Sequence, residues 1–247
     1  MKTVILQSHS TDALKPWLRG CLASVEAWAA HVGADYRFLG DELFRHIPSW
    51  VREKVAPQTV IATDLARLRL MQQTLREGYD RVLWLDADML VFAPERLPLP
   101  EGPHAVGREV WVQQSGAGQK AYRKVHNAFL MATKGDSFLP FYADAAERML
   151  TRAAPPLAPQ FIGPKFLTAL HNMTGLHVEE RAGMLSPLAL RDVLVGGGPA
   201  LEKTLEGHKV PPAAFNLSAS YAGRESDSVL NTEADYKAVI EKLFDLI

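Results

Sequence analysis

Short apolar runs alternate with helical stripes over the first third of the chain. Residues 3–7, TVILQ, form a run rich in β-branched side chains, which is typical of a buried strand. Between 14 and 32 apolar residues recur at helical spacing, and Gly33 follows, so we predict an amphipathic helix there with Asp12 as its cap. ADYRFLG, residues 34–40, predicts a second strand. The chain therefore opens as strand, helix, strand.

The same alternation continues toward the middle of the chain. Residues 41–60 contain Pro48 and Pro57 and are predicted to be irregular. A helix is predicted over 63–77, ending at Gly78, and the strand RVLWL follows at 81–85. Strands that alternate with helices of this length indicate βαβ units and a mostly parallel sheet that is covered on both faces.

The second half has weaker patterns. It predicts a Pro-rich loop at 93–103, a mobile segment at 111–120 and a strand at 126–132. A helix over 137–151, capped by Asp136, and a Pro-rich connection at 153–164 are predicted to follow. The last predicted elements are a short helix with Pro164 in its first turn and a closing helix from about Glu233. There is no internal repeat, long linker or abrupt change of composition. We therefore predict one Rossmann-like α/β/α domain with a mostly parallel mixed sheet.

Two carboxylates interrupt the apolar run LWLDADMLVF, residues 83–92. Side chains two apart on an extended segment point the same way, so Asp86 and Asp88 are expected to converge. Two close carboxylates in apolar surroundings need a cation or a proton between them, and Mg²⁺ or Mn²⁺ prefers such oxygen ligands. The pair is expected at the carboxyl end of a strand, where open α/β sheets bind ligands. The alternative is a solvated turn.

A second polar pair lies on the helix before this run. Asp64 and Arg67 are three residues apart in the expected first turn of that helix, so they share one face. The amides of a helix N-terminus suit an anionic ligand. The alternative is an exposed ion pair that contributes a few tenths of a kcal/mol, roughly, to stability.

Composition narrows the function classes. The chain has 247 residues, 47% of them hydrophobic and 22% charged, with a net charge of -1, which argues against electrostatic binding to nucleic acid or to a membrane surface. The single cysteine, Cys21, excludes an internal disulfide and a zinc site of several thiolates. The sequence contains no apolar segment long enough for a transmembrane helix, and we expect a cytoplasmic protein.

Several segments together resemble one enzyme family. GYDRVLWLDADMLVF resembles the DxD region of type A-fold glycosyltransferases, and TVIATDLARLRLMQQTL is similar to the Ser/Thr-Asp-x-x-Arg helix of the sugar-binding-region glycosyltransferases. NAFLMATKGDSFLPFY and the FIGP turn are also similar to that family, so the resemblance covers roughly residues 3–170. It implies a hexosyltransferase-like enzyme that uses Mn²⁺ or Mg²⁺ and moves a sugar from a nucleotide-sugar, a UDP-sugar, to a saccharide or other hydroxyl acceptor, with retention.

The resemblance also implies roles for parts of the chain. Residues 1–92 would be the nucleotide-binding part and 93–247 the acceptor-side part. Asp86 and Asp88 would bind the metal, and Asp86 would also contact the donor ribose. The other donor-contacting residues would be Gln7, Asp64, Arg67, Asn127 and Gln160. For Asn127 and Gln160, an ordinary hydrogen-bonding role in a strand end or loop is the alternative.

The last third departs from the family pattern. A further metal ligand would come from His208 in EGHKVPP or from Asn216 in AFNLSASY, neither of which matches the family well. No catalytic base can be assigned, because nothing distinguishes the carboxylates Asp192, Glu225 and Asp227. A retaining enzyme requires no such base.

Three other functions compete with this interpretation. A phosphotransferase or phosphatase with a DxD nucleophile would have Thr or Val where this chain has Leu90, and a later acidic pair that is missing. A sugar-1-phosphate nucleotidyltransferase would have a Gly-rich loop containing Arg where this chain reads QSHSTD. A non-catalytic nucleotide-sugar-binding protein would keep the site without turnover.

Overall fold

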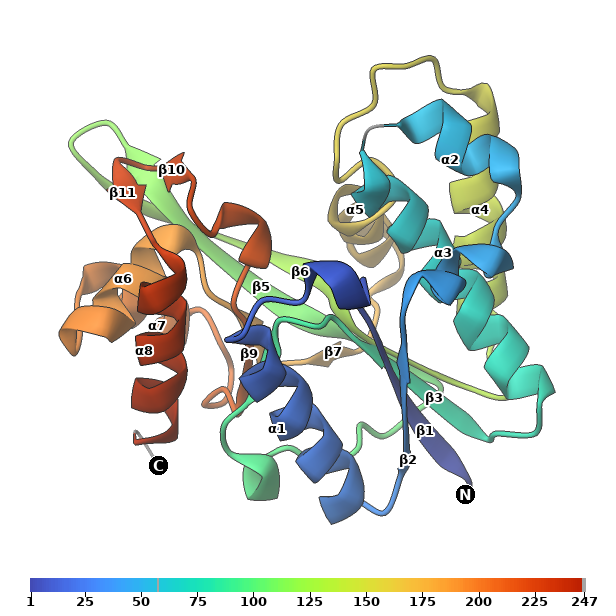
Figure 1. Ribbon diagram of the computed structural model, residues 1–247, viewed down its shortest axis with the longest axis horizontal. Helices are drawn as coiled ribbons and strands as arrows, with labels where there is room; N and C mark the ends of the chain where they lie inside the picture. The colour runs from blue at the N-terminus through green and yellow to red at the C-terminus, as the bar shows by residue number, and fades with distance from the viewer. Residues whose placement is uncertain (57, 246–247) are drawn as a thin grey trace.

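A six-stranded mixed sheet forms the centre of the molecule, with strand order β2-β1-β3-β6-β5-β7 (Figure 1). The computed structural model describes residues 1–56 and 58–245. Strand β1 pairs in parallel with β2 and β3, and β5 with β7, whereas β6 is antiparallel to β3 and β5. A three-stranded sheet, β4-β9-β8, and the hairpin β10-β11 accompany it. The predicted fold class, a mostly parallel mixed sheet within α/β/α layers, is confirmed.

The strands and helices follow one another in chain order. The strands are β1 (Thr3–Ser8), β2 (Asp35–Leu39), β3 (Arg81–Leu85), β4 (Met89–Val91), β5 (His104–Ser115), β6 (Gly118–Thr133), β7 (Val178–Glu179), β8 (Ala182–Met184), β9 (Ala214–Asn216), β10 (Glu225–Ser226) and β11 (Val229–Leu230). The α-helices are α1 (Leu18–His31), α2 (Ser49–Val55), α3 (Thr59–Arg76), α4 (Phe138–Arg152), α5 (Pro164–Thr174), α6 (Pro187–Val195), α7 (Pro199–Glu206) and α8 (Glu233–Phe244). Short 3₁₀ helices are η1 (Thr11–Ala13), η2 (Asp41–His46), η3 (Pro94–Arg96) and η4 (Ala219–Tyr221).

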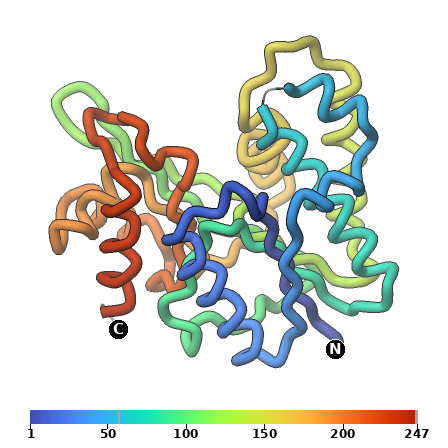
Figure 2. Tube along the Cα trace, viewed as in Figure 1, coloured from blue at the N-terminus to red at the C-terminus, as the bar shows by residue number. Residues whose placement is uncertain are grey.

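Two hydrophobic clusters cover the two faces of the sheet. On β1, Ile5 belongs to one cluster and its neighbours Val4 and Leu6 to the other, as expected for a strand that is buried on both faces. The first cluster includes side chains of α1, α6 and α8, and the second includes those of α2, α3, α4 and α5. In Figures 1 and 2 the helices α2 to α5 rise as a lobe on one side, opposite the long hairpin of β5 and β6.

Most predicted elements are confirmed, but three segments differ. Residues 41–60 were predicted irregular, yet they contain η2, α2 and the start of α3; Pro57 lies outside the described residues. Residues 111–120 were predicted mobile, yet they form the end of the β5–β6 hairpin, in which cross-strand pairing stabilises a polar sequence. Helix α1 begins only at Leu18, and Asp12 lies in η1 instead of capping it.

The starts of two helices in the second half of the chain, α4 and α5, agree with the predictions. Both oxygens of Asp136 accept backbone N–H groups at the start of α4, from Phe138 at 3.2 Å and from Leu139 at 3.3 Å. Pro164 is the first residue of α5, where its missing N–H costs no hydrogen bond. Among the described residues, no helix is long and apolar enough to cross a membrane.

Candidate active site

The two carboxylates of the DAD motif lie in a turn between two sheets. Strand β3 ends at Leu85, and the N–H of Met89 donates to the carbonyl of Asp86 at 2.9 Å before β4 joins the second sheet. The expectation of one extended strand through 83–92 was therefore wrong. Burial raises the pKa of Asp88, and the charge of Asp86 in the same turn adds to the rise.

Arg67 connects helix α3 to this turn. Its Nη1 lies 2.9 Å from Oδ1 of Asp86, and its Nη2 lies 3.0 Å from Oδ1 of Asp64. The guanidinium carbon is 5.2 Å from the centroid of the Trp84 ring, and the indole N–H of Trp84 donates to Asp86 Oδ1 at 2.7 Å. We call Asp64, Arg67, Asp86 and Asn127 the Arg67 cluster.

Asn127 completes the cluster from strand β6. Its Nδ2 donates to Asp64 Oδ1 at 2.8 Å, and its carbonyl accepts Arg67 Nη1 at 2.8 Å. Strand β6 bulges where Asn127 lies. Val106 of β5 pairs with Leu130, but the next residue, Gly107, pairs with His126. Residues 127–129 of β6 therefore have no partner in β5. A bulge of this kind re-aims side chains toward a site.

Gly107 and His126 hold the bulge. A Cβ on Gly107 would lie 2.2 Å from the imidazole of His126, so only glycine leaves room for the ring. The N–H of Ala128 donates to Nδ1 of His126 at 3.1 Å, and Nε2 lies 3.1 Å from the carbonyl of Ala182. These contacts assign the proton to Nε2 of a neutral ring. Burial lowers the pKa of His126 to about 3.

The Asp64–Arg67 pair is buried. Asp64 and Arg67 are 2% and 3% exposed, which rules out the surface ion pair considered from the sequence. Helix α3 starts at Thr59, so both residues lie beyond its first turn and away from its free N-terminal amides. Burial raises the pKa of Asp64 to about 6, and the charge of Asp86 adds to the rise, while Arg67 and Asn127 oppose it. Burial acts to lower the pKa of Arg67, but the charges of Asp86 and Asp64 outweigh it, so the pKa is raised.

Asp88 is fixed by the segment that follows β9. Its Oδ1 accepts Nδ2 of Asn216 at 2.6 Å, and its Oδ2 accepts the N–H of Ala219 at 2.7 Å. Burial, followed by repulsion from Asp86, raises the pKa of Asp88 to about 6 against these hydrogen bonds. Asn216 Oδ1 accepts the N–H of Ser218 at 2.9 Å, so in this arrangement its amide nitrogen, not its oxygen, faces Asp88.

The remaining predicted site residues are placed differently. Gln7 joins the site at the end of β1, where its Nε2 donates to the carbonyl of Asp86 at 3.0 Å and its Oε1 accepts the hydroxyl of Tyr36 at 2.9 Å. The side chain of Gln160 is exposed on the turn before α5. His208 Nδ1 contacts the carbonyl of Glu180 at 2.6 Å, and within the described residues no contact joins His208 to Asp86 or Asp88.

Sequence reasoning missed three contributors. Trp84 and Tyr36 were interpreted only as parts of strands, although they donate to Asp86 and Gln7. Gly163, in the FIGP turn, packs on the cluster so closely that a Cβ there would lie 2.3 Å from Asp64 Oδ2. That carboxylate oxygen has no hydrogen-bond partner in the described part of the chain. The family-like FIGP motif was the available signal for Gly163.

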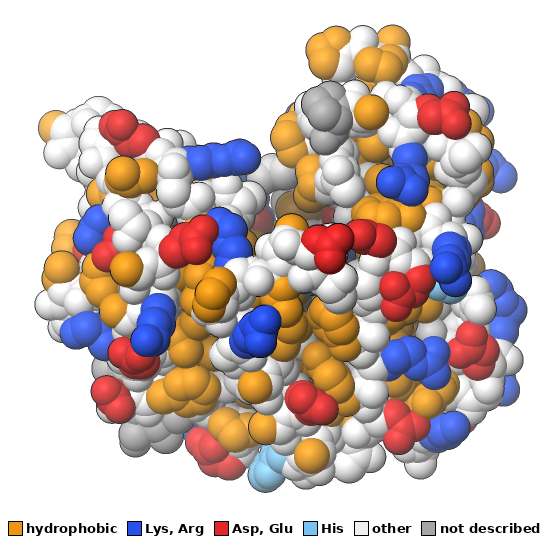
Figure 3. All heavy atoms as spheres, viewed as in Figure 1, with side chains coloured by type: hydrophobic (Ala, Val, Ile, Leu, Met, Phe, Trp, Pro, Cys, Tyr) orange, Lys and Arg blue, Asp and Glu red, His pale blue; other side chains and the backbone are white. Residues whose placement is uncertain are grey.

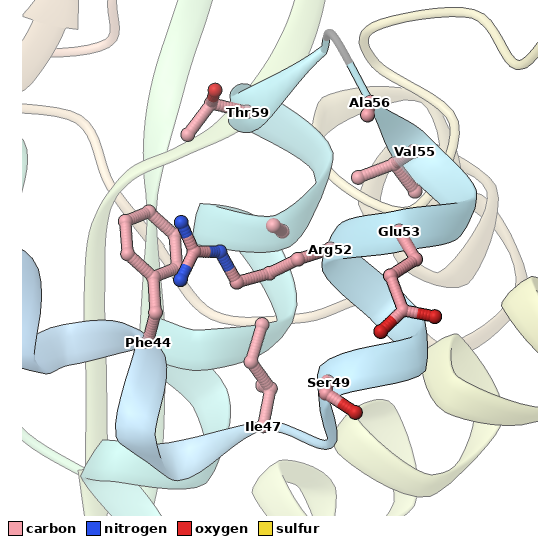
Figure 4. A pocket seen from close by; sticks show the side chains of 9 residues that line it. Phe44, Ile47, Ser49, Arg52, Glu53, Val55, Ala56 and Thr59 are labelled. Atoms are coloured by element: carbon pink, nitrogen blue, oxygen red, sulfur yellow. The ribbon is translucent and has the colours of Figure 1, made fainter.

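The molecular surface is hollowed on one side. Figure 3 shows the surface hollowed between the lobe of α2 to α5 and the β5–β6 hairpin, with basic side chains on the hairpin side. Separate from the Arg67 cluster, a pocket of about 540 Å³ lies beside α2 and the start of α3. Figure 4 shows the guanidinium of Arg52 beside the ring of Phe44 in that pocket, at 4.9 Å from the ring centroid. No group of three or more His, Cys, Asp or Glu side chains arranged for a metal occurs in residues 1–56 and 58–245.

Comparison with known proteins supports the fold. The chain matches no protein-family model and no curated protein sequence. It is similar to the crystal structure of a glycosyltransferase involved in glycosylation of the major capsid of PBCV-1, with a TM-score of 0.50, 11% identity, and coverage of 98% of this chain and 99% of that one. It also matches the galactosyltransferase LgtC in complex with donor and acceptor sugar analogs (TM-score 0.47, 14% identity, 97% and 95% covered). A third match is the apo-form glycosyltransferase GlyE of Streptococcus pneumoniae (TM-score 0.43, 13% identity, 100% and 63% covered).

Proposed function

We propose that the protein is a metal-dependent glycosyltransferase that transfers a sugar from a nucleotide-sugar, a UDP-sugar, to a hydroxyl acceptor with retention. The observation behind this proposal is the contact of buried Arg67 with Asp86, next to Asp88 and at the carboxyl ends of β1 and β3. That edge is where α/β sheets bind ligands. The similarity in fold to a glycosyltransferase agrees with it at the level of the fold.

The residues of the DAD turn fit a hard divalent cation. Both side chains offer carboxylate oxygens, and burial with mutual repulsion raises the pKa of Asp88, a situation that a bound cation relieves. The side chain of Asp86 is 27% exposed, and among the described residues no donor contacts its Oδ2. When bound, Mn²⁺ or Mg²⁺ would supply positive charge that stabilises the leaving diphosphate. We assign Asp86 and Asp88 as its protein ligands.

The other residues of the site have positioning roles in this proposal. Asn216 and the Ala219 amide hold Asp88, and a ligand role for Asn216 itself would require its amide to turn. His208 is left out of the proposed metal site because its contacts are with Glu180 and Phe215. Asp64 and Arg67 are buried under Asp86, so they fix its orientation, while Gln7 fixes the backbone of the turn. Contacts of Asp64, Arg67, Asn127 and Gln160 with a donor remain predictions.

The first experiment measures donor cleavage without an acceptor. Water can replace the acceptor, so incubation of the protein with a panel of nucleotide-sugars and Mn²⁺ should release nucleoside diphosphate and free sugar slowly. Chelation of the metal and the substitution Asp88→Asn should both abolish the release. A surface variant, Asp144→Asn, serves as a control, because Asp144 lies on α4 with a 60% exposed side chain.

Two further assays separate the rival functions. A phosphotransferase would release inorganic phosphate from a simple phosphate ester and would be inhibited by beryllium fluoride. A non-catalytic binding protein would bind the nucleotide-sugar with Mn²⁺ in calorimetry but would release neither product. Either result, with no sugar freed from any donor, contradicts the proposed transferase activity.

A further inference from the structure

One face of the β5–β6 hairpin combines two half-buried aromatic rings, Trp111 and Tyr122, with exposed lysines that the proposed donor site does not use. Trp111 is paired directly with Tyr122, and Gln113 with Lys120, so these side chains share a face. On the opposite face the β5 residues Val110 and Val112 are at most 1% exposed, and Val110 packs on Gly207 after α7. Their partners on β6, Arg123 and Ala121, are exposed. On the face of Trp111 and Tyr122 both rings keep partial access to solvent, and the side chain of Lys120 beside them is exposed.

This face adjoins the turn that holds Asp88. The ring of Trp111 lies 5.4 Å from that of Tyr221, the last residue of η4. Ala219, the first residue of η4, donates its N–H to Asp88 Oδ2 at 2.7 Å. The aromatic face thus begins at the segment that fixes Asp88 and continues along the hairpin.

The β5–β6 hairpin is held in place by a contact with the β10–β11 hairpin. The N–H of Gln114 donates to Asp227 Oδ1 at 3.0 Å, which ties the β10–β11 hairpin to β5. Asp227 and Ser228, the turn residues of that hairpin, have φ of 52° and 64°, as two-residue hairpin turns require. A surface built on paired strands presents its side chains more precisely than a loop does.

Two lysines flank the Tyr122 ring. Lys120 Nζ is 5.1 Å and Lys124 Nζ 5.8 Å from its centroid. Lys124 has a partner, since its Nζ lies 3.7 Å from Oε1 of the buried Glu109. Within the described residues no carboxylate lies within 4.0 Å of Lys120, so its charge is available to a ligand.

We propose that Trp111, Tyr122 and Lys120 bind the acceptor, and that the acceptor is a saccharide with an anionic substituent. Aromatic faces attract the C–H groups of a pyranose ring through their negative quadrupole, and an unpaired ammonium beside them selects a carboxylate or phosphate. This inference rests on the proposed function, because it names the acceptor class of that reaction. The inference goes beyond the proposed function because nothing in the donor site specifies the acceptor.

The test measures sugar binding by ligand-observed NMR titration of the full chain. The probes are cellobiose, the singly charged cellobiouronic acid, and glucose 6-phosphate. We expect the acid to bind the parent protein about 2- to 5-fold more tightly than cellobiose, the range for an exposed charge pair. Either 500 mM NaCl or Lys120→Ala should remove that preference and leave cellobiose binding in place. Stronger binding of the phosphate than of the acid would identify phosphate as the preferred anion and also supports the proposal.

Three variants test the aromatic contribution and specificity. Tyr122→Ala should weaken both disaccharides about 2- to 10-fold, whereas Tyr122→Phe, which keeps the ring, should not. Lys134→Ala is the matched control, because Lys134 is exposed just beyond the other end of β6. Equal binding of cellobiose and the acid by the parent, or equal effects of Lys120→Ala and Lys134→Ala, would overturn the proposal.

Donor cleavage, measured in parallel on the parent protein, distinguishes failure of the acceptor proposal from failure of the proposed transferase activity. A protein that hydrolyses a nucleotide-sugar but shows no charge preference refutes the acceptor assignment alone. A protein that binds the acid preferentially but releases no nucleoside diphosphate from any donor supports the anionic sugar site and refutes the proposed transferase activity.

Discussion

Arg67 and Asp86 form an ion pair between the middle of helix α3 and the end of strand β3, with Nη1 2.9 Å from Oδ1. Arg67 is 3% exposed, whereas the side chain of Asp86 is 27% exposed. The pair therefore joins the hydrophobic core under α3 to the surface of the candidate site. Because the pair is buried on one side, its effect on stability and its effect on the site are coupled.

The first prediction concerns the loss of this buried cation. Arg67→Met keeps much of the side-chain volume but leaves Asp64 and Asp86 without their partner, so we expect the free energy of unfolding to fall by about 3 to 5 kcal/mol. Urea denaturation of both proteins measures the difference. Arg69→Met is the control on the same helix: Arg69 pairs with Asp144 and Glu147 nearer the surface, and its loss should be about 1 kcal/mol or less. Equal losses in the two variants would show that the Arg67 cluster has no special role.

The second prediction concerns the close approach of Gly163 to the cluster. A methyl group there would lie 2.3 Å from Asp64 Oδ2 and 3.0 Å from Nδ2 of Asn127, so Gly163→Ala must displace buried partners. We expect a destabilisation of about 1 to 3 kcal/mol, as for other overpacked sites. In Gly118→Ala the new methyl group meets no atom within 4 Å, so its effect should stay within about 0.5 kcal/mol. A thermal melt of Gly163→Ala that matches the parent would contradict the packing described.

The third prediction separates the structural and metal-binding roles of Asp88. Asp88→Ala removes the acceptor of the Asn216 amide and of the Ala219 N–H. Each buried donor left unpaired lowers the free energy of unfolding by about 1 to 3 kcal/mol. Relief of the repulsion from Asp86 offsets part of this loss. Asp88→Asn keeps one acceptor oxygen and should be the more stable variant.

Mn²⁺ gives the second readout for Asp88. At about 100 times its dissociation constant, a ligand that binds only the folded state stabilises it by about 2.7 kcal/mol, so Mn²⁺ should raise the melting temperature of the parent. It should not raise that of either Asp88 variant. If Mn²⁺ stabilises Asp88→Asn as much as the parent, Asp88 is not a metal ligand.

The fourth prediction follows from the buried neutral imidazole of His126, whose pKa is lowered to about 3. A histidine in the unfolded chain binds a proton near pH 6.5, so below that pH the unfolded state holds more protons and stability falls as the pH falls. This one group should remove about 2 kcal/mol between pH 7 and pH 5. His126→Gln cannot titrate, so its stability should depend less steeply on pH. Urea denaturation at both pH values compares the slopes, and parallel slopes would contradict a buried neutral His126.

The sequence by itself determined the elements whose patterns are local. The β-branched runs at β1 and β3 and the apolar stripe of α1 predicted their elements, because burial of one face or of both faces leaves a periodic record in the sequence. Asp136 and Pro164 marked two helix starts, because capping depends on neighbouring residues only. Asp86 and Asp88 were identified as the candidate site because charges within an apolar run are unusual.

Only the tertiary structure decided how the site is built. Asp64, Asp86 and Asn127 meet at Arg67 from helix α3, the turn after β3 and strand β6, through a bulge in β6 that depends on the fit between Gly107 and His126. The polar hairpin at 111–120 was missed for the same reason, since its stability comes from pairing between β5 and β6 and from the contact of Gln114 with Asp227. Contacts between residues distant in the chain leave no periodic pattern, so the roles of Trp84, Gly163 and Ala219 became visible only in the folded protein.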